Sequence, residues 1–72
     1  MTQKLWRAAM TFFQQMVEKL IHQSNTHGYT GWDKESEVSN TTLLRKLREN
    51  IEEEDWVDVA ILAMILDYRR GT

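Results

Sequence analysis

The sequence contains no cysteine, no proline and only three glycines among its 72 residues. Without cysteine, neither disulfides nor thiolate zinc sites can cross-link the fold, and two histidines are too few for a zinc finger. A chain of this length buries only a marginal core by itself. Because 42% of its residues are hydrophobic, we expect one domain, residues 1–72, that gains stability as a homodimer, a tetramer or another homo-oligomer.

The chain also lacks an excess of positive charge and a long apolar run. Its net charge of −2 argues against direct binding to nucleic-acid phosphates. The longest apolar run, residues 59–66, is far too short to span a bilayer. The N-terminal segment has polar residues interspersed throughout and offers no small-residue cleavage site, unlike a signal peptide. We therefore expect a cytoplasmic protein without a membrane segment.

Hydrophobic periodicity predicts two helices joined by a polar loop. Apolar residues recur at three- and four-residue spacing from about 2 to 23. Glycines, asparagines and hydroxyl residues interrupt the period from about 24 to 40. A second helix is predicted from about 41 to 69, continuous unless it breaks near 53–55, with Arg69 and Arg70 complementing its dipole before Gly71. The expected fold is all-α: a two-helix hairpin that dimerises, or pairs further, into a four-helix bundle.

Six carboxylates lie between residues 49 and 58, in the stretch "ENIEEEDWVD". On a helical projection of the second helix, Glu54 and Asp58 fall on the apolar stripe and Asp55 at its edge. The other three fall on the opposite side, where a solvated face explains them: Glu49, Glu52 and Glu53. A buried carboxylate without a partner costs several kcal/mol. The inner carboxylates therefore need a cation.

Two kinds of cation satisfy this requirement equally well from the sequence. Arg7 or Lys19 of the first helix could pair with Asp58, which gives a purely structural bundle. A hard divalent cation such as Mg²⁺ prefers the same carboxylate oxygens.

The block "DWVDVAILAMILD" (residues 55–67) resembles the second acidic element of the all-α MazG-like nucleotide pyrophosphohydrolases, especially their short phage-type members. The matching positions are Asp55, Asp58, Val59, Ala60, Ala63 and Met64. Upstream, "LLRKLRENIEEE" resembles the first acidic element of that family, and "NTHGYTGWDKES" resembles its Gly-Trp loop. The resemblance covers about two thirds of the chain in the same order.

The resemblance implies an enzyme that cleaves nucleoside triphosphates into monophosphate and pyrophosphate in the host cytoplasm, using Mg²⁺ or Mn²⁺. It implies catalytic roles for Glu53, Asp55 and Asp58. The implied metal ligands are these three and two more, Glu49 and Glu54. The implied nucleotide-binding residues are His27, Tyr29 and Trp32. The alternative for these loop residues is packing at the end of the hairpin.

The sequence departs from the family pattern in two places. Asn50 stands where the first element carries a glutamate, and the segment between the two elements is missing, so Glu53 and Asp55 are nearly adjacent. On a continuous helix, Glu49 and Glu53 point away from Asp58, and a metal site would need carboxylates from a second subunit. The missing segment favours a rival function, a small non-enzymatic phage-type protein whose acidic band binds and blocks a basic host partner.

Overall fold

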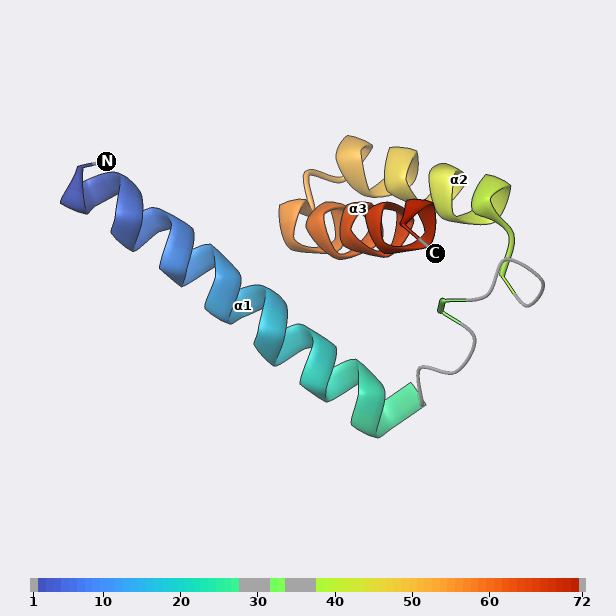
Figure 1. Cartoon of the computed structure of the whole chain (residues 1–72), viewed down its shortest axis with the longest axis horizontal. Coiled ribbons are helices and arrows are strands. Elements are labelled where there is room, and N and C mark those ends of the chain that lie inside the picture. The colour runs from blue at the N-terminus through green and yellow to red at the C-terminus, as the bar shows by residue number, and fades with distance from the viewer. Residues whose placement is uncertain (1, 28–31, 34–37, 72) are drawn as a thin grey trace.

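The computed structural model describes residues 2–27, 32–33 and 38–71 of the chain. The described residues form three α-helices and no strand: α1 (Gln3–His27), α2 (Asn40–Glu52) and α3 (Trp56–Arg70) (Figure 1). The all-α prediction is thus confirmed. No helix in these ranges is long and apolar enough to cross a membrane.

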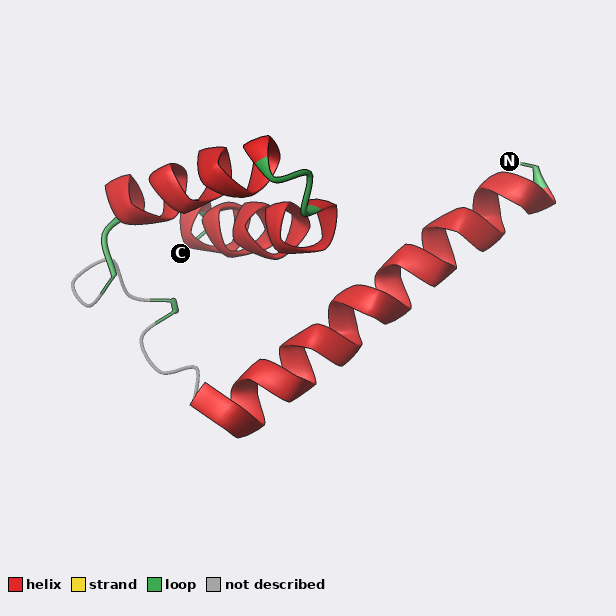
Figure 2. Cartoon of the chain, turned by 180° about the vertical axis from the view of Figure 1, so that it is seen from behind, coloured by secondary structure: helices red, strands yellow, loops and turns green. Residues whose placement is uncertain are grey.

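α3 is the helix that connects the fold, because it packs against both α2 and α1. α2 and α3 form a short antiparallel hairpin, and α1 passes it obliquely on the α3 side (Figure 2). α1 begins after Thr2, whose hydroxyl oxygen accepts from the backbone N–H of Leu5 at 3.2 Å. It continues to His27, four residues beyond the predicted end.

The prediction of one continuous second helix is wrong. α2 ends at Glu52, and the next residues form a turn in which Glu54 has a left-handed backbone, with φ of 60°. The N–H of Glu54 donates to the carbonyl of Ile51 at 3.1 Å, and the N–H of Asp55 donates to that of Asn50 at 2.9 Å. These two bonds are those of a Schellman helix end, in which glycine usually takes the left-handed position. The break falls near residues 53–55, where the sequence analysis allowed for one, but a glutamate occupies the position that glycine usually takes.

Because of this turn, the apolar stripe predicted for one long helix is divided between α2 and α3, whose apolar sides face each other. Leu43 from α2 and Ile61 and Ile65 from α3 are the buried residues of the core. Partly buried side chains surround them: Met16, Leu20, Trp32, Val38, Val57, Leu62 and Leu66. Since α3 folds back on α2, Leu44 and Ile51, which a straight helix would place on the core stripe, are exposed.

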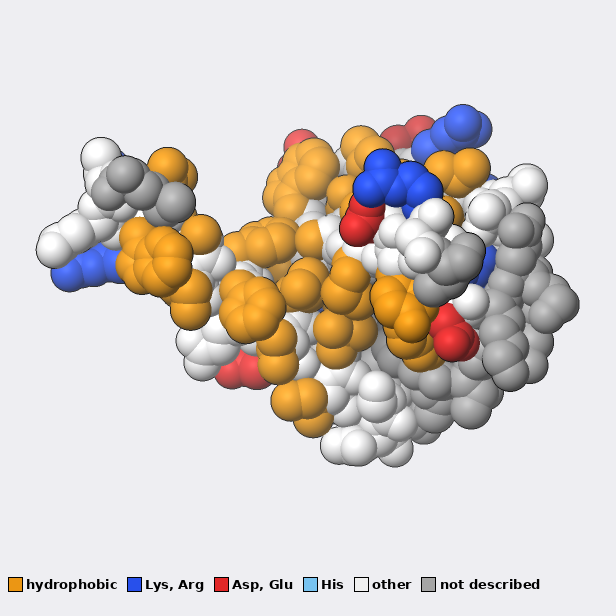
Figure 3. Space-filling view, viewed as in Figure 1, with side chains coloured by type: hydrophobic (Ala, Val, Ile, Leu, Met, Phe, Trp, Pro, Cys, Tyr) orange, Lys and Arg blue, Asp and Glu red, His pale blue; other side chains and the backbone are white. Residues whose placement is uncertain are grey.

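The two halves of α1 differ sharply in their surroundings. Its packed half, residues 16–25, supplies Met16 and Leu20 to the core. Its exposed half, residues 3–15, projects beyond the hairpin, and every residue there is exposed. This half nevertheless carries large apolar side chains, which Figure 3 shows spread along the helix.

Candidate functional site

The inner carboxylates meet a lysine where the packed half of α1 passes the start of α3. The ammonium Nζ of Lys19 lies 2.7 Å from Oδ1 of Asp58 and 3.3 Å from Oδ2 of Asp55. All three side chains are partly buried. Of the two cations considered from the sequence, the lysine partner of Asp58 is therefore confirmed, with Lys19 and not Arg7 in that position. Arg7 lies on the exposed half of α1.

Asp55 also has a structural role that the helical projection missed. It is the N-cap of α3, and its Oδ1 accepts from the backbone N–H of Asp58 at 3.2 Å. Asp58 lies in the first turn of α3, where the helix dipole favours a negative charge. A signal was present in the sequence, because a capping acceptor three residues before an acidic residue, ahead of an apolar run, is a capping-box pattern.

The electrostatics of the cluster favour the charged forms of Lys19 and Asp55. The hydrogen bond from the Asp58 N–H, helped by the nearby Lys19 ammonium, lowers the pKa of Asp55 below its usual value. The hydrogen bond to Asp58 is the largest influence that raises the pKa of Lys19, although partial burial opposes it. The cluster therefore places one ammonium between the side-chain oxygens of Asp55 and Asp58.

The five carboxylates proposed as metal ligands do not converge in this fold. Within the described part of the chain, no group of three or more His, Cys, Asp or Glu side chains could hold a metal ion. Glu54, predicted on the inner stripe, is exposed, because it occupies the left-handed position of the turn. Glu53 is exposed beside it, and Glu49 lies 3.8 Å from the Arg45 Nε on the surface of α2.

A cavity of about 210 Å³ lies between the three helices and brings together residues distant in the sequence. Its polar wall includes Asp58, Lys46 and Asn50, and its aromatic wall is Trp32. The side-chain amide of Asn50 is already occupied, since it donates to the backbone carbonyl of Lys46 at 2.8 Å. The structure thus places one predicted nucleotide-binding residue, Trp32, in the same cavity as Asp58. Tyr29 and the side chain of His27 lie outside the described residues.

Trp32 is anchored to the end of α3 by a residue whose role the sequence did not reveal. Arg69 donates from Nε and Nη2 to the carbonyl of Trp32, at 2.9 and 2.8 Å. Its Nη1 donates to the carbonyl of Val38 and to Oδ1 of Asn40, both at 2.8 Å. The Trp32 ring also packs against Tyr68, with ring centroids 5.0 Å apart. The loop is thereby fastened to α3, which agrees with the packing alternative for Trp32.

No protein-family model matches the sequence, and the searches of curated proteins and of solved structures find no similar protein. The resemblance to the MazG-like enzymes therefore stays a prediction that depends on the motif residues alone.

Proposed function

We propose that this chain is a non-enzymatic helical protein that acts by binding another protein, the rival to the enzyme in the sequence analysis. The observation that supports this proposal is the occupancy of the inner carboxylates. Lys19 satisfies both Asp55 and Asp58, and Asp55 additionally caps α3. A divalent ion bound there would have to displace the Lys19 ammonium and to compete with the N-terminal cap of α3. This donor set does not fit a resident metal.

The surface proposed for the partner is the turn between α2 and α3, which we call the acidic turn (Glu52, Glu53 and Glu54). All three side chains are exposed, and none forms an ion pair with another described residue. Trp56 follows directly and is 54% exposed. Tryptophan is a frequent energetic anchor of interfaces, and a charged rim accelerates association with a partner of opposite sign. The partner chemistry that fits is a basic surface with an apolar pocket for Trp56.

The acidic turn can be tested directly with a labelled peptide of alternating arginine and leucine as the probe. We expect binding that weakens with salt, and roughly tenfold weaker binding after Glu52→Gln, Glu53→Gln and Glu54→Gln together. Trp56→Ala is expected to have an effect of similar size. The control is Asp33→Asn with Asp67→Asn, which removes exposed carboxylates outside both the acidic turn and α1. Equal losses in the control, or no binding by the wild type, would count against the acidic turn.

The enzyme alternative has its own assay. Mg²⁺ and Mn²⁺ are titrated calorimetrically into the wild type and into Asp58→Ala, and pyrophosphate release is measured with a panel of deoxynucleoside triphosphates. We expect neither metal binding nor release. Release that Asp58→Ala abolishes would overturn the proposal and restore the hydrolase.

A second candidate function, nucleotide binding without hydrolysis, is favoured by the cavity of about 210 Å³ that Trp32 and Asp58 line. Trp32 could contact a base there, and Lys46 could pair with a phosphate. The cavity is smaller than the roughly 300–1,000 Å³ of most ligand sites, so it would enclose only part of a nucleotide. Equilibrium dialysis with nucleosides and nucleotides tests this candidate. Binding weakened by Trp32→Ala and Lys46→Ala, with no pyrophosphate released, would favour it over protein binding.

A further inference from the structure

A shallow apolar groove that the proposed function does not use runs along the exposed half of α1 and into the first residues of its packed half. Its apolar residues are Trp6, Met10, Phe13 and Val17, at the three- and four-residue spacing of one helix face. Trp6 is 57% exposed and Phe13 is 53% exposed. Two opposite charges, Arg7 and Glu18, border the groove near its two ends.

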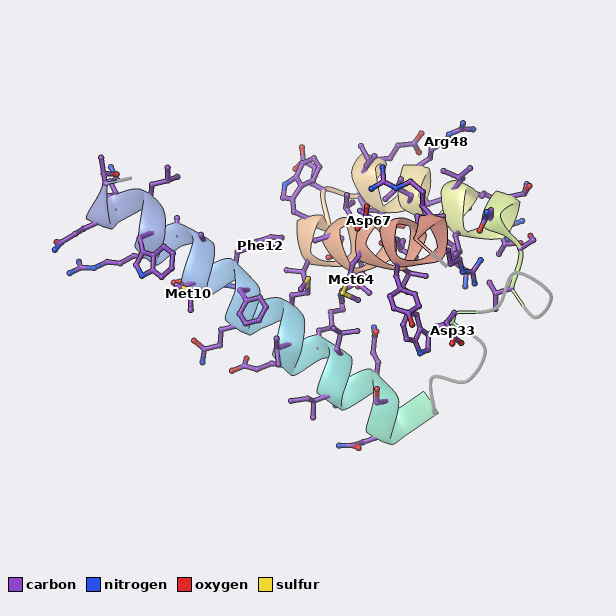
Figure 4. The ribbon with its side chains drawn as sticks, in the orientation of Figure 1. Met10, Phe12, Asp33, Arg48, Met64 and Asp67 are labelled. Carbon is purple, nitrogen blue, oxygen red and sulfur yellow. The ribbon has the colours of Figure 1, made fainter. Side chains whose placement is uncertain are left out.

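The groove is distinct from the side of α1 that faces α3. On that side Met16 and Leu20 pack against the core, and Lys19 forms the ion pairs with Asp55 and Asp58. On a helix of 100° per residue, the groove residues are centred roughly 100° around from these contact residues. The hairpin therefore leaves the groove accessible to a partner helix. Figure 4 shows Met10 on the part of α1 that projects past the hairpin.

The chain exposes more surface than a compact monomer of its mass, and the excess is comparable to one side of a dimer interface. The chain exposes 5750 Å², whereas a compact monomer of 8.6 kDa is expected to expose about 4,700 Å². The excess of roughly 1,000 Å² is close to the ~800 Å² that each partner buries in an interface of standard size. We expect a second copy that lies along the groove to remove part of this excess surface from water.

We propose that the groove is covered by the same groove of a second copy, with the two α1 helices antiparallel. A two-fold axis that passes between positions 12 and 13 places Arg7 of each protomer opposite Glu18 of its partner, because both lie equally far from the axis. In a parallel pair in the same register, Arg7 of one protomer and Glu18 of its partner would instead lie 11 residues apart along the helix axis, roughly 17 Å, which is too far for an ion pair. Neither side chain has an ion-pair partner among the described residues. Glu18 only accepts a hydrogen bond from Gln14, at 3.2 Å. The interface is isologous, so each pair of opposite charges occurs twice.

Charge reversal tests both the interface and its direction. Dimer dissociation is measured by sedimentation from micromolar to submillimolar concentration for the wild type, Arg7→Glu, Glu18→Arg and the double variant. Each single reversal is expected to weaken the dimer roughly tenfold, and the double variant is expected to recover most of the loss, because the opposite charges face each other again. Arg48→Glu, on α2 away from α1 (Figure 4), is the matched control and is expected to change nothing.

A substitution in the middle of the groove provides a second readout. Phe13→Glu is expected to weaken the dimer by roughly a hundredfold or more, since it removes apolar area and places like charges near the axis. Circular dichroism verifies that α1 remains helical. A wild type that stays monomeric at the highest concentration, or a double reversal no tighter than the single ones, would overturn the proposal. These outcomes do not depend on the acidic turn, whose neutralised variant is expected to dimerise like the wild type.

Discussion

The two halves of α1 show that surroundings, and not residue type, decide which apolar side chains are buried. Phe12 and Phe13 in the exposed half are as apolar as Met16 and Leu20 in the packed half, yet only the latter pair joins the core. The reason is a difference in helix length. α1 has 25 residues and α3 has 15, so α1 extends ~38 Å and α3 only ~22 Å. Even in parallel alignment α3 could cover little more than half of α1, and the packed half, residues 16–25, is shorter than that.

The strongest test of this comparison removes apolar volume from each region in turn. Ile61 is 3% exposed and Leu5 is 59% exposed. Ile61→Ala is expected to lower the free energy of unfolding by about 3 kcal/mol, because it leaves a cavity in a three-residue core. Leu5→Ala is expected to cost less than ~0.5 kcal/mol in the monomer. Urea unfolding followed by circular dichroism at submicromolar concentration measures both values, and equal losses would contradict the division of α1 into halves.

A second test strengthens the packed region without altering either half of α1. Glu54 has φ of 60°, a conformation that costs a non-glycine residue roughly 1–2 kcal/mol. Glu54→Gly removes this strain at the price of greater freedom in the unfolded chain, and we expect a net gain of ~0.5–1 kcal/mol. The matched control is Glu53→Gly, where φ is −81° and glycine is expected to destabilise. Hydrogen exchange should slow in α2 and α3 for Glu54→Gly and stay unchanged at residues 3–15.

This turn marks the limit of what the sequence predicts about the fold. Periodicity predicts the all-α class, because apolar spacing follows directly from helix geometry. It does not predict that α2 stops at Glu52, since the left-handed position is occupied by a glutamate and no glycine or proline marks the end. Tertiary contacts between Leu43 and the α3 residues Ile61 and Ile65 outweigh the local preference for a continuous helix.

Helical periodicity also predicted one part of the candidate site, the need of Asp58 for a cationic partner, but not the positions of Glu54 and Arg69. Burial of Asp58 on an apolar stripe requires a cation, and Lys19 was one of two basic residues available to supply it. Glu54 was placed wrongly, because its predicted direction depended on a helix that does not continue through it. The role of Arg69 was not predictable, since its acceptors belong to Trp32, Val38 and the first residue of α2, Asn40, which only the fold brings near the end of α3.

The third test removes the ion pairs that hold the packed half of α1 against α3. Lys19→Met keeps the length of the side chain and leaves Asp55 and Asp58 without their ammonium partner. Because such partly exposed pairs contribute little, we expect the midpoint of thermal unfolding to fall by only a few degrees. Lys4→Met, in the exposed half, is the matched control and should leave the midpoint unchanged. If both variants behaved alike, Lys19 would not distinguish the two halves.

The smallest expected effect is a pH dependence that belongs to the packed half alone. The raised pKa of Lys19 means that its contribution is present below its unfolded pKa and is lost as pH rises through the folded value. The lowered pKa of Asp55 means that its contribution is present above the unfolded pKa and is lost as pH falls through the folded value. The difference in melting midpoint between the wild type and Lys19→Met should therefore be largest near neutrality and narrow below about pH 4 and above about pH 10. Melting curves across this range measure this difference.

The melting midpoint of Lys19→Met should still depend on pH in acid, because the N–H of Asp58 still donates to the Asp55 carboxylate. Its dependence on pH above about pH 10 should disappear, because the Lys19 ammonium is absent. A difference that stayed constant across the whole range would mean that Lys19 stabilises the packed half by its hydrocarbon chain and not by its charge.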